Sequence, residues 1–279
     1  MENSDFFDIQ RKIVANMTSE SWRTIPHVAF SYEPDITSFE RHYAEAFKPL
    51  GVSFNTMILS VIANALKAAP SMNAHFSFNR WTVTGRLDVR ESVDISMPAG
   101  LPDGRMMTLN IHDCASLTPV QLQARIGDTM RRAAASNLDE VMMSTAMHDT
   151  VSAALHGHLW KALGRMVGRL MNPRCAALLH GKERKEYYKR PLTERLGVAD
   201  IEQGSITVSN FGSLHRGLRG VPLLLEVVPP QVVAIGIGAI QDAGGRRILP
   251  LCIAFDHRAL DFGDIVPFIK ALDAVFESV

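Results

Sequence analysis

The amino-acid sequence predicts a mixed α/β (α+β) fold built on one mixed β-sheet. Segments with the alternating or continuous apolar character of β-strands occur in both halves of the chain. Amphipathic segments with helical spacing separate them, but strands and helices do not alternate strictly. The chain has 279 residues, of which 47% are apolar and 21% charged, so it can form a large core without disulfide bonds. We expect a single domain over residues 1–279.

Each element follows from a local pattern. The N-terminal half predicts, in order, a helix over 9–19, a strand over 27–32, helices over 35–46 and 54–69, strands over 76–83, 92–97 and 106–111, and a helix over 118–135. Thr118 is the expected N-cap of that last helix, with Pro119 in its first turn. The C-terminal third predicts a charged loop over 181–195, strands over 205–210, 231–237 and 248–255, a hairpin turn at 244–245 and a closing helix after Asp264.

Charge and cysteine content exclude several classes of protein. The Lys+Arg and Asp+Glu counts are both 29, so no net positive charge attracts nucleic acid. Three cysteines without CxxC spacing predict neither a disulfide framework nor a Cys-type zinc site, and they fit a reducing compartment. The N-terminus lacks a signal-peptide core, and Glu226 and Pro229-Pro230 interrupt the apolar segment 221–240. We therefore expect a cytoplasmic protein that does not bind nucleic acid or span a membrane.

The strongest candidate catalytic side chains lie in residues 255–261, where a predicted strand ends in the sequence FDHRALD. Catalytic sites often lie at strand ends, and histidine is the usual general base near neutral pH. His257 is therefore a candidate base, with Asp261 four residues later. On spacing alone, a His–Asp pair that only stabilises the strand–helix corner is an equally good interpretation.

Six segments in the same order resemble one family. They are RKIVANM (11–17), IPHVAFSYEPDIT (25–37), PSMNA (70–74), SITVSNFGSL (205–214), VVPPQVVAIGIGAI (227–240) and DHRALD (256–261). Together they resemble the catalytic (E2) acyltransferase domain of 2-oxo acid dehydrogenase complexes, in the chloramphenicol acetyltransferase superfamily. The resemblance implies a chloramphenicol acetyltransferase-like mixed sheet with flanking helices. It also implies transfer of an acyl group between coenzyme A and a thiol or another acceptor.

The resemblance assigns roles to individual residues. His257 matches the family's general base, which takes the proton from a thiol. Ser209 matches the hydroxyl that donates a hydrogen bond to the tetrahedral oxyanion. Asp261 matches the acid that holds the histidine loop in place, with Arg11 or Arg258 as its arginine partner. We expect Asn210, Phe262 and Arg258 to contact the substrate.

Two of the departures from the family pattern bear on the active site and its substrate. Phe262 stands where the family has a glycine after the motif aspartate, so a ring can narrow the channel or shift His257. No lipoyl or peripheral subunit-binding domain is expected. We therefore expect no covalently bound cofactor, coenzyme A as substrate, and a lipoyl or pantetheine arm on a separate carrier protein. The resemblance also implies a homotrimer with active sites between subunits. A catalytically degenerate trimer that acts as a scaffold is the alternative.

A helical insert is expected at about residues 142–195. Lys161, Arg165 and Arg169 share one of its faces. That face can receive an acidic carrier, coenzyme A phosphates or a membrane surface, but a solvated basic face on a packed helix is the simpler interpretation. His156 and His158 form an HxH pattern without a carboxylate or cysteine at ligand spacing, so no metal site is expected.

Overall fold

A computed structural model describes residues 7–101, 104–155, 163–164, 167, 176–214 and 220–277. The chain forms two compact units. One consists of Met1–Met17 and Thr129–Glu202, and the other of Thr18–Asp128 and Gln203–Val279. All the predicted catalytic residues belong to the second, larger unit, so its sheet is what positions them.

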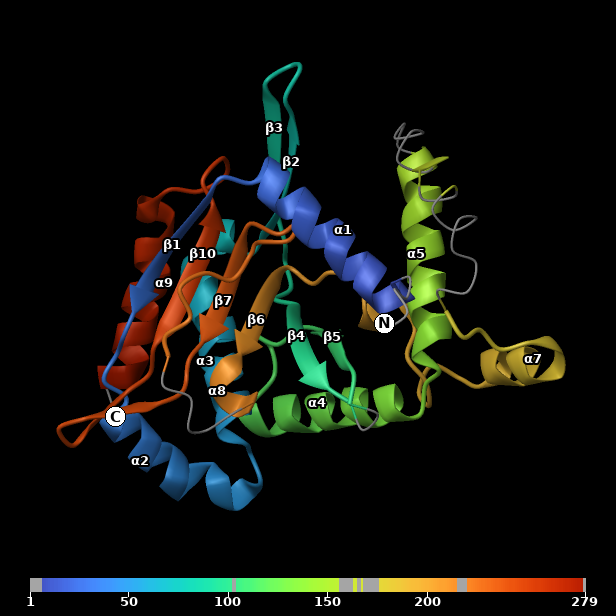
Figure 1. The fold of residues 1–279 in the computed structure, drawn as a ribbon. Coiled ribbons are helices and arrows are strands. Elements are labelled where there is room, and N and C mark those ends of the chain that lie inside the picture. The colour runs from blue at the N-terminus through green and yellow to red at the C-terminus, as the bar shows by residue number, and fades with distance from the viewer. Residues whose placement is uncertain are drawn as a thin grey trace, which may run out of the picture. The chain divides into compact units, whose positions relative to one another are not determined.

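The larger unit contains a six-stranded mixed sheet (Figure 1). Its strand order is β1 (His27–Tyr32), β10 (Leu251–Asp256), β7 (Val233–Ile237), β6 (Ile206–Asn210), β4 (Ile95–Gly100) and β5 (Met106–Ile111). Strands β4, β6 and β7 are parallel to one another, whereas β10 is antiparallel to both of its neighbours. The mixed sheet confirms the predicted fold class.

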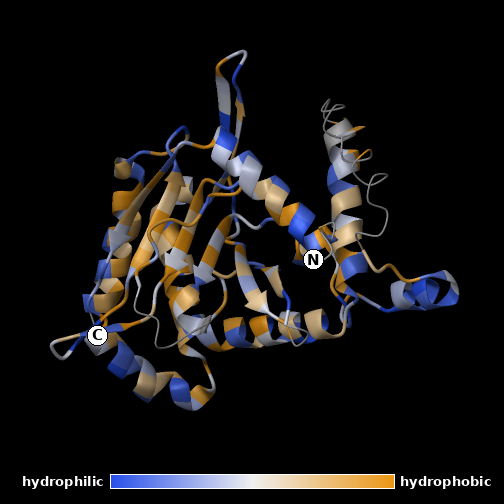
Figure 2. Cartoon of the chain, viewed as in Figure 1, coloured by the Kyte–Doolittle hydropathy of each residue, from blue (hydrophilic) through white to orange (hydrophobic). Residues whose placement is uncertain are grey.

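Three helices of the larger unit pack against one another. Helix α3 (Phe54–Ala65) contacts α9 (Phe262–Glu277), which also contacts α2 (Thr37–Ala46). Phe39 of α2 and Phe268 of α9 are almost completely buried, and the Phe39 ring meets Phe276 edge-on at 5.2 Å. Figure 2 shows the hydrophobic residues concentrated along the central strands. Burial of a Phe side chain contributes about 1.5–3 kcal/mol, so this packing fixes where α9 and the end of β10 lie.

Two hairpins and several short elements complete the larger unit. The hairpins are β2 (Ala74–Asn79) with β3 (Thr84–Val89), and β8 (Gln241–Ala243) with β9 (Arg246–Ile248). Gly244 and Gly245 turn the second hairpin with φ of +64° and +86°, which confirms the predicted turn. The remaining short elements are α8 (Phe211–Leu214) and the 3₁₀ turns Lys48–Leu50, Leu66–Ala68 and Pro70–Met72. Helices α1 (Ile9–Thr24) and α4 (Pro119–Ala134) each have residues in both units.

The smaller unit is helical in its described part and contains two buried carboxylates. Its elements include α5 (Leu138–Leu155), α7 (Gly181–Lys189) and a 3₁₀ turn, η4 (Val198–Asp200). Asp200 accepts hydrogen bonds from both terminal nitrogens of Arg132 at 2.7 and 2.8 Å. Glu140 is completely buried and accepts from the backbone amide of Leu179 and the side chain of Arg184. Buried charges are tolerated when paired in this way.

Most predicted elements are confirmed, with small shifts at their ends, but two predictions are wrong and one strand was not predicted. Residues 181–189 form helix α7 instead of a charged loop, because Tyr187 gives this polar segment a buried anchor. The strand over 84–89 was missed, since its partly exposed pattern carries little apolar signal. The strand predicted over 248–255 is two strands, with a break at Leu249 and Pro250.

The proposed basic face of the insert, at Lys161, Arg165 and Arg169, lies outside the described residues, as does the HxH pattern. Within the described part of the chain, no helix is long and apolar enough to cross a lipid bilayer.

Candidate active site

The corner between β10 and α9 holds the predicted base on a fixed backbone. The last residue of the strand, Asp256, is 1% exposed, and its backbone amide donates to the carbonyl of Val232. The backbone amide of His257 donates to the carbonyl of Pro26 at 3.1 Å. Backbone bonds on both sides of the corner therefore leave the His257 main chain little freedom.

The His257 ring has a defined tautomer. Its Nδ1 lies 3.0 Å from the carbonyl oxygen of Leu260, and a carbonyl can only accept a hydrogen bond. Nδ1 must therefore carry the hydrogen, and in the neutral ring the lone pair is then on Nε2. The side chain is 44% exposed, so a solvent-borne group can approach it. His257 is thus arranged to accept a proton at Nε2.

Asp261 lies next to this histidine without a direct hydrogen bond to it. Its Oδ1 is 3.6 Å from Nδ1 of His257, and its side chain is 80% exposed. The Asp261 backbone amide donates to Oδ2 of Asp264 at 2.8 Å, while the Asp264 amide donates back to the Asp261 carbonyl. Asp261 therefore occupies the N-cap position of α9, with Asp264 as the third helical residue that completes the cap. This arrangement fits an orienting role.

Arg258 does not pair with Asp261; it pairs with Asp256. Its Nε donates to Oδ1 at 2.9 Å, and its Nη2 donates to Oδ2 at 2.6 Å. The Arg258 guanidinium also lies 5.5 and 5.8 Å from the ring centroids of Phe76 and Phe78 on β2. Forked pairing of this kind is directional, and stacking on aromatic rings adds to it. The donors of Arg258 therefore brace the residue that precedes His257.

No pattern in the sequence pointed to this brace. Asp256 stands inside the motif, and Phe76 and Phe78 alternate along a predicted strand, but none of the three had an expected role. Arg11, the other partner considered for Asp261, belongs to the other compact unit.

Phe262 replaces the family glycine without straining the backbone. It is the first residue of α9 and is not among the described residues with positive φ, so no glycine is required there. Its ring is 52% exposed and lies 5.5 Å from the ring of Phe255 and 6.2 Å from that of Phe30. The ring of His257 also packs edge-on to Phe255, at 5.9 Å. Phe262 therefore adds an aromatic surface near the histidine and leaves its ring accessible.

Ser209 and Asn210 end strand β6. Ser209 is 7% exposed. The Asn210 side chain donates to Oδ1 of Asn55 at 2.7 Å and accepts from the backbone amide of Ser213 at 2.9 Å. It therefore fixes the turn into α8, where a Cβ on Gly212 would approach the Gly238 carbonyl oxygen to 2.6 Å. Both amide ends of Asn210 are thus used within the chain.

The structure does not bring Ser209 and His257 together within one chain. Ser209 pairs with Gly236 on β7, and Gly236 pairs with Cys252 on β10. His257 follows Cys252 by five residues. With about 3.3 Å per residue along a strand and ~4.8 Å between strands, this register separates the two residues by roughly 19 Å. In Figure 1 the arrows of β6 and β10 accordingly point to opposite ends of the sheet.

The two described cysteines are not reactive thiols at neutral pH. Cys114 and Cys252 are both buried. Burial raises the pKa of the Cys114 thiol to about 12 and also raises that of Cys252. Neither thiol is therefore a ready nucleophile at neutral pH. Among the described residues, no group of three or more His, Cys, Asp or Glu side chains could hold a metal ion.

Comparison with known proteins finds a matching family model and sequence relatives. A sequence model described as 2-oxoacid dehydrogenases acyltransferase (catalytic domain) matches residues 2–152 and 180–279. Dihydrolipoyllysine-residue acetyltransferase components of pyruvate dehydrogenase complexes are 22% identical to the chain. The one from Mycoplasma pneumoniae aligns over 96% of this chain and 54% of its own length, and the one from Zymomonas mobilis over 99% and 50%. The chain thus spans about half the length of these curated relatives.

Solved structures show the same fold. A probable dihydrolipoamide acetyltransferase from Listeria monocytogenes superposes with a TM-score of 0.65 at 17% identity, covering 99% of this chain and 95% of that one. The cubic core of a pyruvate dehydrogenase multienzyme complex superposes with a TM-score of 0.64 at 18% identity, covering 100% and 93%. These structures support the sheet and helix arrangement described above.

Proposed function

The chain belongs to the 2-oxoacid dehydrogenase acyltransferase (catalytic domain) family, and we propose that it transfers an acyl group between coenzyme A and a second thiol. The second thiol is a lipoyl or pantetheine arm on a separate protein. The observation that carries this proposal is the hydrogen bond from Nδ1 of His257 to the Leu260 carbonyl, which leaves Nε2 as the proton acceptor. No covalently bound cofactor takes part in the proposed reaction.

The proposed reaction begins with proton transfer. A free thiol has a pKa near ~8.5, so only a few per cent is ionised at neutral pH. Nε2 of His257 takes the S–H proton, and the resulting thiolate attacks the carbonyl carbon of the acyl thioester. The tetrahedral intermediate then collapses, expelling the other sulfur as a thiolate that takes the proton back from Nε2. A positioned base of this kind contributes about 10²–10⁴-fold in rate.

Ser209 supplies the second part of the reaction. When the tetrahedral intermediate forms, the carbonyl oxygen becomes an oxyanion, and the Ser209 hydroxyl donates a hydrogen bond to it. Ser209 sits at the end of a buried strand, so its position is set before the reaction. One such donor typically contributes roughly 10²–10³-fold.

A second copy of the chain must complete each site. The separation of about 19 Å between Ser209 and His257 is far beyond hydrogen-bond reach, so one substrate carbonyl cannot contact both residues of one chain. The assembly proposed is a cytoplasmic homotrimer in which His257 of one copy faces Ser209 of a neighbour. The likeness to the cubic core of a pyruvate dehydrogenase multienzyme complex supports an assembly of several copies.

The scaffold alternative has lost its main support. It depended on Phe262 blocking the histidine, but the Phe262 ring packs on Phe30 and Phe255 while the His257 side chain stays 44% exposed. An acceptor can therefore reach the proposed base.

A thiol-release assay tests the function. Purified protein is given a panel of acyl-CoA esters with dihydrolipoamide as acceptor, beside a His257→Ala variant. We expect turnover with at least one ester, and a fall of about 10²–10⁴-fold in the variant. Turnover that is equal in both proteins would refute the role of His257. No turnover with any ester would refute transfer between coenzyme A and this acceptor.

A further inference from the structure

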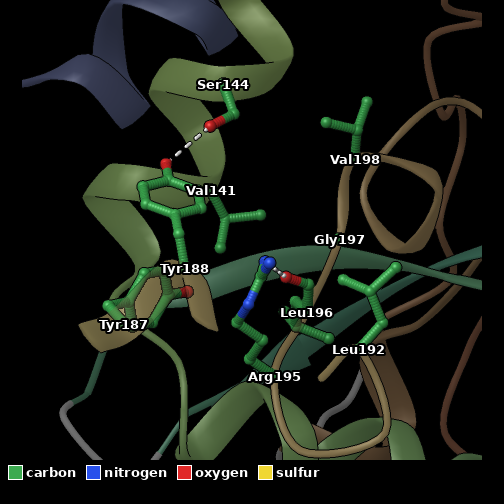
Figure 3. Close-up of a pocket in the computed structure, with 9 residues that line it drawn as sticks. All are labelled: Val141, Ser144, Tyr187, Tyr188, Leu192, Arg195, Leu196, Gly197 and Val198. Carbon is green, nitrogen blue, oxygen red and sulfur yellow. Dashed lines mark hydrogen bonds between the residues drawn. The ribbon is translucent and has the colours of Figure 1, made fainter. Parts of the chain in front are cut away.

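Polar side chains around a cavity of the smaller unit bond to one another and to the backbone (Figure 3). The cavity has a volume of about 240 Å³. The Tyr188 hydroxyl contacts that of Ser144 at 2.9 Å, and Nη1 of Arg195 donates to the carbonyl of Leu196 at 3.3 Å. These bonds join α5, α7 and the segment before η4, so they hold the elements of that unit together. A buried network in the larger unit differs, because it leads to the predicted base.

Gln231 is the centre of this buried network. It is 1% exposed and lies two residues before β7. Its Oε1 accepts a hydrogen bond from the Thr207 hydroxyl of β6 at 2.6 Å, and its Nε2 donates to the Gly204 carbonyl at 2.9 Å. Nε2 also lies 3.4 Å from the hydroxyl oxygen of Ser96 on β4. The Gln231 amide therefore joins the start of β7 to β6 and β4.

The Gly204 carbonyl that accepts from Gln231 also accepts from His75 of β2. Nε2 of His75 lies 3.0 Å from this oxygen, and because a carbonyl can only accept, that nitrogen carries the hydrogen. A Cβ on Gly204 would collide with the backbone carbonyl of Asp94, so the close approach requires glycine. The backbones of Gln231 and His75 form an isolated antiparallel bridge. Gln231 is thus fixed both through its side chain and through its main chain.

The residue after Gln231 holds the strand that ends at the predicted base. The Val232 carbonyl accepts a hydrogen bond from the backbone amide of Asp256 at 2.9 Å. His257 follows Asp256 directly. A displacement of Val232 along its strand would therefore displace the backbone on which His257 is carried.

The residue before Gln231 holds the aromatic support of the arginine brace. The Pro230 carbonyl accepts a hydrogen bond from the backbone amide of Phe76 at 2.7 Å. The Phe76 ring lies 5.5 Å from the Arg258 guanidinium, which forks onto Asp256. Gln231 therefore lies in a closed loop of contacts that returns to the end of β10.

The chemistry of the amide suits a role in positioning. A buried amide is unfavourable unless its hydrogen bonds are made, and an apolar side chain of similar size avoids that cost. Hydrogen bonds are directional, however, whereas the hydrophobic effect is not. The bonds of Gln231 therefore set the relative placement of β4, β6 and β7 more narrowly than apolar packing would.

We propose that Gln231 is a positioning residue for His257. Because Gln231 is buried, it acts through Val232 and Pro230 and keeps Nε2 of His257 where it takes the thiol proton. Misplacement of a reacting group by ~1 Å can cost about 10²-fold in rate, so a small displacement is enough. The expected effect on rate rests on the proposed acyl transfer, whereas the expected effect on the His257 ring does not.

The variant Gln231→Leu tests the proposal in the full chain, because it removes both polar ends of the amide at nearly constant size. We expect kcat in thiol release to fall at least about tenfold, with the KM for acyl-CoA within about twofold of the wild-type value. Diethyl pyrocarbonate modifies an unprotonated imidazole nitrogen, and mass spectrometry follows this reaction at His257. Its rate should change at least about threefold, because the ring is no longer held in one place.

Two substitutions at Thr207 keep the test decisive if Gln231→Leu fails to fold. Thr207→Val has nearly the same shape and removes only the donor to Oε1 of Gln231, whereas Thr207→Ser restores that donor. We expect the valine variant to lower kcat and change the modification of His257, and the serine variant to behave as the wild type. Tyr43→Phe removes a half-buried hydrogen bond to the Val52 carbonyl, outside this network, and is the matched control.

The two readouts separate this inference from the proposed function. A changed rate of His257 modification in Gln231→Leu and Thr207→Val, with Thr207→Ser and Tyr43→Phe unchanged, supports positioning even if the wild type releases no thiol. Equal modification rates in all the proteins would overturn the inference, whether or not the wild type is active. A raised KM with an unchanged kcat in Gln231→Leu would overturn it as well, because the loss would then lie in substrate binding.

Discussion

Chains in which only Ser209 or only His257 is replaced by alanine show where each active site is completed. If both residues acted within one chain, a mixture of Ser209→Ala and His257→Ala chains would contain no complete site. The strand register separates the two residues by roughly 19 Å in one chain, so the proposed site takes His257 from one copy and Ser209 from another. Mixed oligomers of the two variants should then regain activity.

The activity expected of the mixture follows from the fraction of its sites that are complete. In an equal, random mixture, a site obtains an intact His257 with probability one half and an intact Ser209 with probability one half. Roughly one quarter of the sites are therefore complete, whatever the number of copies in a closed ring. The separate variants should retain at most about one hundredth of the activity, so the mixture should exceed either by more than about tenfold.

The assay is thiol release by oligomers reassembled from differently tagged variants. The matched control mixes each single variant with the double variant Ser209→Ala/His257→Ala, in which no site can be complete. We expect activity near one quarter of the wild-type level from the two single variants and none above background from the control. Confirmed mixed oligomers without recovered activity would refute a site completed between copies.

Four further predictions concern other parts of the chain. Arg258→Lys keeps the charge but loses the fork to Asp256, so kcat should fall about tenfold with an unchanged KM for acyl-CoA in steady-state kinetics. Phe262→Gly should leave kcat with acetyl-CoA within about threefold of the wild-type value and raise kcat with bulkier esters, because residue 262 is half exposed. Inactivity with every ester would contradict this. Burial raises the pKa of Cys114 to about 12, so at pH 8 roughly one thiol in ten thousand is ionised, and iodoacetamide should label it only after unfolding; rapid labelling of the native protein would contradict this. Glu140→Gln should lower the free energy of unfolding by roughly 2 kcal/mol in urea titrations, since three buried or half-buried donors lose a charged acceptor.

Several features could be predicted from the sequence because short-range patterns determine them. The apolar segments that form β7 and β10 are typical of buried strands. The closing helix repeats its apolar residues at helical spacing. His257 at the end of β10 followed from these two elements together. The helix over 181–189 was not predictable in the same way, since its nine residues carry mostly charge and its anchor is the single buried ring of Tyr187.

Other features depend on three-dimensional arrangement that one sequence does not reveal. The partner of Arg258 depends on its rotamer and on a hairpin that begins far away in the sequence. The distance between Ser209 and His257 depends on strand order and direction, because β7 lies between β6 and β10 and runs antiparallel to the latter. The resemblance supplied the roles of these residues and implied active sites between subunits, whereas the strand register gives the separation of Ser209 and His257 within one chain.

His257 and Ser209, the two halves of the proposed site, are held in place by different contacts. Three constraints converge on His257: the Pro26 carbonyl binds its backbone, the Leu260 carbonyl binds its ring, and Arg258 braces the buried Asp256. Ser209 is held by the buried strand on which it lies. Because each half is held within its own chain, the proposed assembly only has to bring two positioned backbone edges together.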